Sequence, residues 1–211
     1  SRTYGKSQLE MTYDKQLLGQ GDISISFHEL RAGYDLNLTI QNSLQQYTYD
    51  QLNGRSGAVV ALEPRTGKIL AMVSYPDFDP NAERLEADWN TIVERKDSPL
   101  LARATQGLYP PGSTYKIATA AAAYETGRIA ETFQDTGKFE QDGLHVDNYG
   151  KTAYGEIDLK RAFAVSSNFA FCTLGYEMGS DKVLEMAERF GINKSIDFDL
   201  ASSKSQIQYK K

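Results

Sequence analysis

The chain has 211 residues, of which 40% are hydrophobic and 24% are charged, and it carries a formal net charge of −5. This composition is ordinary for a soluble globular protein with a buried core. The negative charge argues against nucleic acid as a partner and against electrostatic docking on anionic lipid. No apolar stretch approaches the length of a membrane span or of a signal sequence, so we expect any membrane anchor to lie outside these residues.

The few cysteines and histidines argue against a metal centre. Cys172 is the only cysteine, so no internal disulfide can form, and its apolar surroundings "NFAFCTLGY" favour burial over reactivity. His28 and His145 lie far apart in the chain and have no further ligands at metal-binding spacing. We therefore expect no metal ion and no cofactor.

The first part of the chain contains a linker, a helix and a β-hairpin. Residues 1–35 are polar and glycine-punctuated, and the alternation in "GDISISF" (21–27) predicts a short strand within them. Apolar residues at helical spacing predict an amphipathic helix over 38–52. In 57–74, two β-rich runs flank the turn "EPRTG" and predict a hairpin. Both arms are almost continuously apolar, so we expect helices to cover both faces.

The remainder of the chain is mostly helical. The segment 82–106 is predicted to be partly helical, with Trp89 as an anchoring side chain. Five alanines between 118 and 123 predict a buried central helix with closely approaching neighbours. The other expected elements are a loop at 74–81, a helix over 113–127 that ends at Gly127, two helical pieces in 158–179 broken near "SSN", a helix over 180–191 and an exposed tail at 203–211.

A serine and a lysine lie three residues apart in "GLYPPGSTYK" (107–116). Ser113 could simply be the N-cap of the helix that follows. The pair could also be catalytic, because side chains at i and i+3 share a helix face and serine needs an adjacent base. To act as that base at pH 7, Lys116 needs a pKa about three units below its reference value near 10.4. Burial and the positive end of the helix dipole both act in that direction.

Three stretches in order resemble the transpeptidase domain of penicillin-binding proteins: "GAVVALEPRTGKILAMVSYPDFDPN", "SPLLARATQGLYPPGSTYKI" and "YGEIDLKRAFAVSSNFAF". The N-terminal "GKSQLEMTYDKQLLGQ" is similar to the linker of monofunctional, class B members. Ser-x-x-Lys and Ser-x-Asn form the established signature of this family, so the assignment follows from the resemblance and not from spacing. Residues 1–35 would then be a linker or pedestal remnant, and 36–211 the N-terminal portion of the transpeptidase domain.

The resemblance implies an α+β fold of the β-lactamase/transpeptidase type, in which an antiparallel sheet is flanked by helices. It implies four catalytic residues: Ser113 as nucleophile, Lys116 as its base, and Ser166 and Asn168 facing them. Ser167 is interpreted as a spacer. Taken alone, "SSN" would instead indicate an N-cap and turn.

The third box of the family, Lys-Thr-Gly, has no match after residue 168. "KTA" at 151–153 precedes "SSN" and is interpreted as a loop look-alike. We therefore expect the fold to be incomplete at the C-terminus and the 57–74 hairpin to have open edges. Open apolar edges predict self-association or complementation by a second chain.

The functional expectation is a peptidoglycan D,D-transpeptidase that forms a serine acyl-enzyme. Its implied partners are peptidoglycan stem peptides, β-lactam antibiotics and a membrane glycosyltransferase, at the outer face of the cytoplasmic membrane. Two alternatives remain open: a β-lactamase or penicillin sensor, and a non-catalytic fragment or scaffold of the same fold. Prompt release of the acyl group would favour the former, and a folded sample that penicillin does not label would favour the latter.

Overall fold

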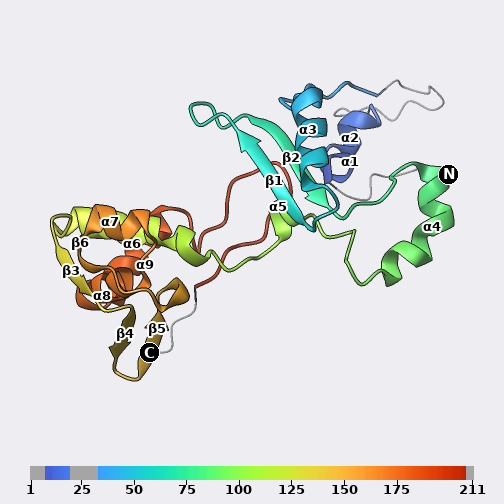
Figure 1. Cartoon of the computed structure of the whole chain (residues 1–211). Coiled ribbons are helices and arrows are strands. Elements are labelled where there is room, and N and C mark those ends of the chain that lie inside the picture. Colours follow the sequence, from blue (N-terminus) through green and yellow to red (C-terminus); the bar gives the residue numbers. More distant parts are fainter. Residues whose placement is uncertain (1–7, 20–32, 208–211) are drawn as a thin grey trace. The chain divides into compact units, whose positions relative to one another are not determined.

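The computed structural model divides into two compact units (Figure 1). The structure describes residues 8–19 and 33–207. The strand predicted at 21–27 lies outside the described residues. The first unit takes in residues 1–108 and 197–203, and the second takes in residues 109–196 and 204–211.

The first unit is built on the predicted β-hairpin. Strands β1 (Gly57–Leu62) and β2 (Ile69–Tyr75) pair antiparallel. The N–H of Gly67 donates to the carbonyl of Glu63 at 2.8 Å and closes the turn, with Gly67 at a φ of +73°. That left-handed conformation suits glycine because it has no Cβ. The hairpin prediction is therefore confirmed.

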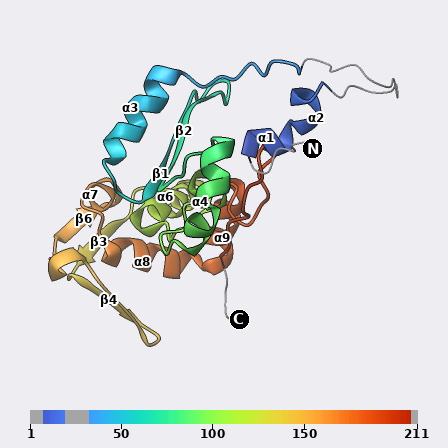
Figure 2. The same ribbon diagram turned by 90° about the vertical axis from the view of Figure 1, so that its right-hand side faces the viewer.

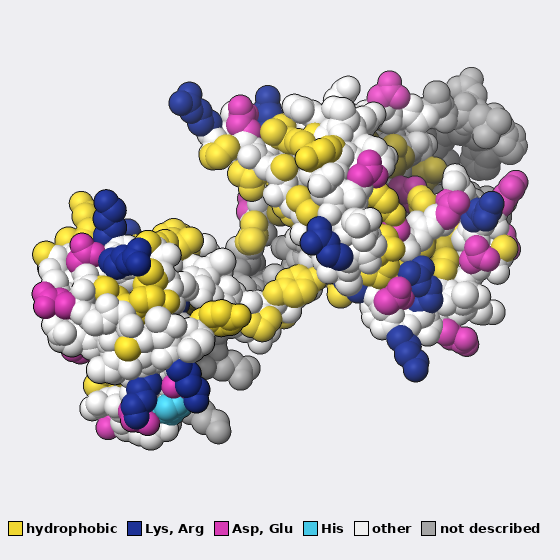
Figure 3. All heavy atoms as spheres, in the orientation of Figure 1, with side chains coloured by type: hydrophobic (Ala, Val, Ile, Leu, Met, Phe, Trp, Pro, Cys, Tyr) yellow, Lys and Arg dark blue, Asp and Glu magenta, His cyan; other side chains and the backbone are white. Residues whose placement is uncertain are grey.

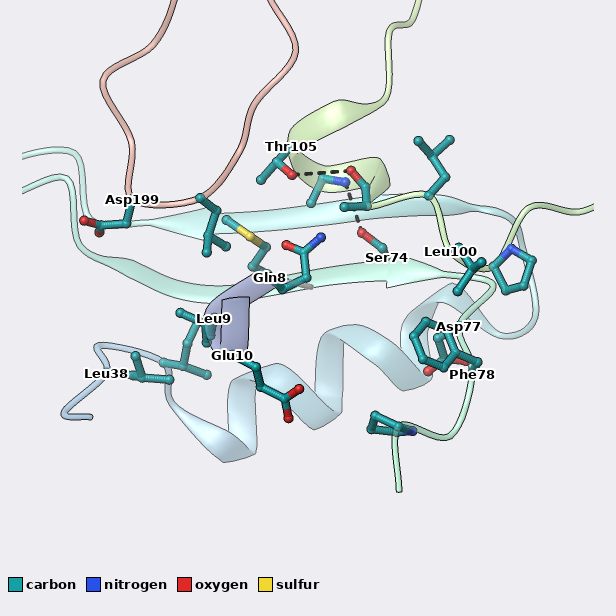
Figure 4. Close-up of a pocket in the computed structure, with 18 of the residues that line it drawn as sticks. Gln8, Leu9, Glu10, Leu38, Ser74, Asp77, Phe78, Leu100, Thr105 and Asp199 are labelled. Carbon is teal, nitrogen blue, oxygen red and sulfur yellow. Dashed lines mark hydrogen bonds between the residues drawn. The ribbon is translucent and has the colours of Figure 1, made fainter. Parts of the chain in front are cut away.

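Helices lie on both sides of this hairpin. The predicted amphipathic helix is α3 (Asn42–Leu52), which runs along β2 (Figures 1 and 2). The short helix α5 (Arg103–Gln106) contacts both strands from the other side, as Figure 4 shows. The remaining helices of this unit are α1 (Gln8–Thr12), α2 (Asp14–Leu17) and α4 (Ala82–Glu94).

Several large apolar side chains of the first unit are nevertheless exposed (Figure 3). In β1, burial alternates along the strand, and Val60 and Leu62 are 41% and 50% exposed. The expectation that both faces of both arms are covered is wrong for β1, because successive side chains point to opposite faces and only one face is covered. Trp89 is 45% exposed and is not a buried anchor. Among the described residues, no helix is long and apolar enough to cross a membrane.

The outer edge of β2 is partly occupied, which corrects the expectation of two open edges. The side-chain amide of Gln45 acts like a strand partner: its Nε2 donates to the carbonyl of Met72 and its Oε1 accepts from the Met72 N–H, both at 2.8 Å. The N–H of Gln41 donates to the carbonyl of Leu70 at 2.9 Å. Among the residues that the structure describes, the outer edge of β1 pairs with no strand.

The second unit is an assembly of helices with two short β-ladders. Its helical elements are η1 (Gly112–Tyr115), α6 (Lys116–Glu125), η2 (Tyr149–Lys151), α7 (Leu159–Ala164), α8 (Asn168–Met178) and α9 (Ser180–Arg189). Its strands are β3 (Thr132–Asp135), β4 (Lys138–Gln141), β5 (Leu144–Asp147) and β6 (Gly155–Asp158). The predicted helical pieces on either side of "SSN" are α7 and α8, and the predicted helix at 180–191 is α9.

The alanine-rich helix α6 packs between α8 and α9, as its composition predicts. Ala118 and Ala122 belong to a cluster with Met186 of α9. On another side, Ala123 joins the main core, in which Leu174 of α8 is fully buried. Small side chains on α6 let both neighbouring helices approach closely, and this packing fixes the start of α6 against the start of α8.

The two β-ladders bring distant polar residues together. Strand β3 pairs with β6, and β4 pairs with β5 so that Lys138 lies opposite Asp147. The N–H of Asn148, just after β5, donates to the carbonyl of Gly137 at 2.8 Å. The residues that end β3 and those that follow β5 therefore lie side by side, next to the start of α8.

The predicted exposed tail is hydrogen-bonded at two of its described residues, Ser203, whose N–H donates to the carbonyl of Thr105 at 2.9 Å, and Ile207. Ile207 is partly buried against the cluster formed by α6 and α9. Its N–H donates to Oδ1 of Asn193 at 2.7 Å. The polar composition of 203–211 conceals this single apolar contact, and the expectation of an exposed tail is wrong at Ile207.

Candidate active site

Ser113 lies at the entrance of the buried helix. It occupies η1, the turn of 3-10 helix that leads directly into α6, and its side chain is exposed. The hydroxyl caps no helix; Oγ lies 3.3 Å from Nζ of Lys116 and accepts a hydrogen bond from Oγ of Ser166 at 2.9 Å. The interpretation of Ser113 as an N-cap is therefore wrong, and its hydroxyl belongs to a cluster of polar side chains.

Lys116 is the centre of this cluster. Its Nζ donates to the carbonyl oxygen of Ser166 at 2.7 Å, to Oδ1 of Asn168 at 2.7 Å and to Oγ of Ser166 at 2.9 Å. The four residues predicted from the sequence thus converge, although Ser166 and Asn168 are 50 and 52 positions from Lys116.

Burial makes it easier for Lys116 to lose its proton. Burial lowers the pKa of Lys116 below its ordinary value, and a negative charge on Cys172 would act in the opposite direction. Two partners of Nζ, the Ser166 carbonyl and Asn168 Oδ1, can only accept. A neutral amine has two N–H groups and one lone pair, so it can donate to both carbonyl oxygens while the lone pair faces the hydroxyls. The cluster can therefore hold Lys116 in the form that accepts a proton.

The orientation of the Asn168 amide is fixed by a hydrogen bond of its nitrogen to the backbone. Its Nδ2 donates to the carbonyl of Asp147 at 2.7 Å, which leaves Oδ1 directed at Lys116. The ring of Phe171, one turn further along α8, lies with its centroid 5.6 Å from Nζ of Lys116. The neighbouring Cys172 is partly buried, and burial raises the pKa of its thiol.

Ser166 has an unusual backbone conformation, because it ends α7 in a Schellman motif. The N–H of Ser167 donates to the carbonyl of Ala162, and that of Ser166 to the carbonyl of Phe163, at 2.9 and 3.1 Å. This motif places its penultimate residue in the left-handed region, usually as glycine. Ser166 is there with a φ of +56°. A serine held in such a strained conformation is typical of a functional site.

This strain can be tested by two substitutions that both remove the hydroxyl. We expect Ser166→Gly to be more stable than Ser166→Ala by up to about 1 kcal/mol, because only glycine adopts a positive φ without steric cost. Urea unfolding of the two variants measures the difference. Equal stabilities, or a more stable alanine variant, would contradict a strained backbone at this position.

Ser167 is not the spacer that the sequence suggests. It is fully buried, it is the N-cap of α8, and its Oγ accepts from the N–H of Ala170 at 3.0 Å. The same Oγ donates to Oδ2 of Asp135 at 2.6 Å. The N-cap interpretation of "SSN" is thus correct for Ser167, while the residues on either side of it turn toward Lys116.

Two further residues of this region, Asp135 and Asn148, were missed by the sequence reasoning. Both are buried and hydrogen-bonded to each other and to the start of α8. No signal pointed to them, because they are separated by 13 residues from each other and lie in short polar stretches around turns. The look-alike "KTA" at 151–153 lies, as expected, in the connection between β5 and β6.

A large groove in the first unit is separate from these residues. It has a volume of about 1430 Å³ and is lined mainly by apolar side chains from α1, β2, α4 and the connecting segments (Figure 4). None of the four predicted catalytic residues lines it, since all four belong to the second unit. Among the described residues, no group of three or more histidine, cysteine, aspartate or glutamate side chains is arranged to hold a metal ion.

An exposed serine at a helix start, next to a partly buried lysine and a second hydroxyl, has the groups that an activated serine nucleophile needs. The family described as "Penicillin binding protein transpeptidase domain" matches residues 57–211. The chain belongs to this family, and its fold is the α+β fold of penicillin-binding transpeptidase domains.

Curated relatives are D,D-transpeptidases. Peptidoglycan D,D-transpeptidase MrdA of Escherichia coli is 33% identical over 221 residues, which covers 95% of this chain and 35% of the relative. Peptidoglycan D,D-transpeptidase PbpA of Mycolicibacterium smegmatis is 39% identical over 179 residues, which covers 76% of this chain and 36% of the relative. The chain thus spans about a third of the length of these relatives.

Solved structures that are similar to this chain belong to the same family. The D,D-transpeptidase domain of a peptidoglycan glycosyltransferase from Eggerthella lenta has a TM-score of 0.84 and 37% identity, over 98% of this chain and 47% of the other. The imipenem acyl-enzyme complex of penicillin-binding protein A from M. tuberculosis has a TM-score of 0.73 and 35% identity, over 79% of this chain and 42% of the other.

Proposed function

We propose that this chain carries the nucleophile of a peptidoglycan D,D-transpeptidase, with Ser113, Lys116, Ser166 and Asn168 as its catalytic residues. The observation that carries the proposal is the contact of Lys116 Nζ with both hydroxyls and with the Asn168 amide. Family membership and the acyl-enzyme complexes of similar structures support the same chemistry.

The first half-reaction forms the acyl-enzyme. Ser113 Oγ attacks the carbonyl carbon of the D-Ala-D-Ala peptide bond, and its proton passes to the neutral Nζ of Lys116, 3.3 Å away. A bond forms between Oγ and the carbonyl carbon, and the developing oxyanion can accept from the Ser113 N–H, which has no intrahelical partner in the first turn.

The second step expels the leaving group. Ser166 Oγ gives its proton to the departing D-alanine amine and regains one from Lys116, at 2.9 Å. The carbon–nitrogen bond breaks, and the acyl group remains on Ser113. The amino group of a neighbouring stem peptide then attacks the ester carbon and gives a proton to Lys116, which is neutral again. The bond between the carbon and Ser113 Oγ breaks, and Lys116 returns that proton to Oγ. A β-lactam would acylate Ser113 in the same way, but its leaving nitrogen stays tethered.

The wider context of the reaction is also part of this proposal. The substrates would be peptidoglycan stem peptides, β-lactams would be inhibitors, and a membrane glycosyltransferase would supply the glycan strands. Such a reaction takes place outside the cytoplasmic membrane. Residues 1–35 would act as a linker, and 36–211 as the N-terminal portion of the transpeptidase domain.

Peptide mapping after exposure to penicillin tests the proposal. We expect one penicillin per molecule of full-length protein, attached to Ser113 and stable for long enough to be isolated. Rapid turnover of the antibiotic would instead identify a β-lactamase. The absence of any adduct on folded protein, or an adduct at another residue, would overturn the assignment of Ser113.

A further inference from the structure

A buried carboxylate lies behind the residues that contact Lys116. Asp135 is 2% exposed and accepts hydrogen bonds from three groups. The N–H of Gly137 and the Nδ2 of Asn148 donate to Oδ1 at 2.7 and 2.9 Å, and Ser167 Oγ donates to Oδ2 at 2.6 Å. Among the described residues, no lysine, arginine or histidine forms an ion pair with it. Its contacts are therefore those of a hydrogen-bond acceptor and not of an ion-pair partner.

Asn148 connects this carboxylate to the start of α8. Its Nδ2 donates to Asp135 and to the carbonyl of Thr152 at 2.8 Å, so its Oδ1 points the other way. There it accepts from the backbone N–H of Asn168 at 2.7 Å and from that of Phe169 at 3.0 Å. The direction of the Asn148 amide, and with it the position of the Asn168 backbone, depends on two acceptors: the Asp135 carboxylate, which is a side chain, and the Thr152 carbonyl, which belongs to the backbone.

Ser167 provides a second connection. Its hydroxyl hydrogen goes to Asp135, which leaves its oxygen to accept from the N–H of Ala170. Asp135 thus fixes both the residue in the middle of the segment 166–168 and the backbone at its end. The outer two side chains of that segment are the ones that contact Lys116.

We propose that Asp135 is a positioning residue, which acts through Asn148 and Ser167 to hold the segment 166–168 with its oxygen atoms against Lys116. The inference rests on the proposed function for its catalytic consequence. The positioning of atoms around Nζ of Lys116 is independent of that function.

The chemistry of the site explains why this residue is an aspartate. A carboxylate offers two acceptor oxygens and no donor, and all of its partners here are donors. Asparagine has the same shape but would turn an NH₂ group toward at least one of those donors. Support of this segment also matters for Ser166, because a left-handed backbone is unfavourable for serine and persists only where the surrounding structure holds it.

The test compares Asp135→Asn with the wild type in the full-length protein. We expect the first-order rate constant of acylation by penicillin to fall about 100-fold, as for a displacement of about 1 Å. The affinity of the complex that precedes acylation should change much less. In addition, ¹³Cε NMR of Lys116 should show its titration midpoint rising toward the ordinary lysine value, since a loosened segment admits water around Nζ.

Two further variants separate positioning from stability. Leu174→Ala removes core packing on the same helix but touches none of these polar groups, so it should destabilise the fold without moving the Lys116 midpoint. Ser167→Ala removes only one of the two connections. It should therefore lower the acylation rate and raise the Lys116 midpoint, but by less than Asp135→Asn does. It replaces Asp135→Asn if that variant does not fold.

The outcomes are distinct. If Asp135→Asn acylates at the wild-type rate and the titration midpoint of Lys116 is unchanged, the positioning role is overturned. A slower rate in Asp135→Asn with the Lys116 midpoint unmoved would also overturn it and leave a structural role only. If the wild type itself forms no adduct, the proposed function fails, whereas the NMR midpoint still tests whether Asp135 controls the surroundings of Lys116.

Discussion

Replacing Ser113 by alanine is expected to abolish covalent labelling of the full-length protein by penicillin, with a loss of rate of about ten-thousand-fold or more. The hydroxyl that forms the ester is removed, so the oxygen to which the acyl group of penicillin would bind is missing. Because the Ser113 side chain is exposed, the free energy of unfolding should change by no more than about 0.5 kcal/mol. Fluorescent penicillin on a denaturing gel, together with urea unfolding, measures both quantities.

Ser195→Ala is a matched control for this variant. Ser195 is also exposed, and it lies after α9, outside the cluster around Lys116. This variant should be labelled like the wild type. Labelling of Ser113→Ala at a comparable rate would show that another residue is the nucleophile.

Replacing Lys116 by arginine should be nearly as damaging as replacing it by alanine, with a loss of about 10²- to 10⁴-fold in the acylation rate. Arginine keeps the positive charge but cannot be deprotonated in a protein, so it cannot accept the proton of Ser113. Stopped-flow acylation of Lys116→Arg and Lys116→Ala measures the two losses. An arginine variant that acylates at close to the wild-type rate would show that charge alone matters at this position.

The pH dependence follows from the same residue. Burial lowers the pKa of Lys116 in the folded protein, so the wild-type acylation rate should rise with pH and level off below the ordinary lysine value of 10.5. Between the lowered pKa of Lys116 in the folded protein and its ordinary value in the unfolded chain, the unfolded chain binds more protons than the folded protein. This residue therefore makes the fold more stable as pH rises through that window, and less stable below it. A rate independent of pH would contradict the role of Lys116 as base.

The cluster around Lys116 could be predicted from the sequence because its residues lie within two short signatures. Ser113 and Lys116 share a helix face by spacing alone, and Ser166 and Asn168 were added by resemblance to a family. Their contact across about 50 residues could not be predicted from spacing, since it depends on how closely α6 and α8 pack. Small alanines on α6 indicated that close approach, and the structure confirms it.

The sequence was least informative where one side chain contacts a different partner from the side chains on either side of it. Ser167, between two residues that face Lys116, turns inward because the left-handed Ser166 reverses the chain. Asp135 reaches Ser167, and Asn148 reaches the backbone at the start of α8, only because two β-ladders bring them there. Such residues carry no local pattern, because the partners that define them lie far away in the chain.

The sequence by itself determined the local elements of this protein: the hairpin, the alanine-rich helix, the break at "SSN" and the pair of residues at the entrance of α6. Hydrophobic periodicity and turn residues act over a few positions, so they can be recognised without knowing the fold. Only the tertiary structure decided which face of β1 is covered, how Gln45 fills the edge of β2, and which buried groups hold the segment 166–168. Those features depend on which distant donor meets which acceptor, and packing determines that only once the elements have come together.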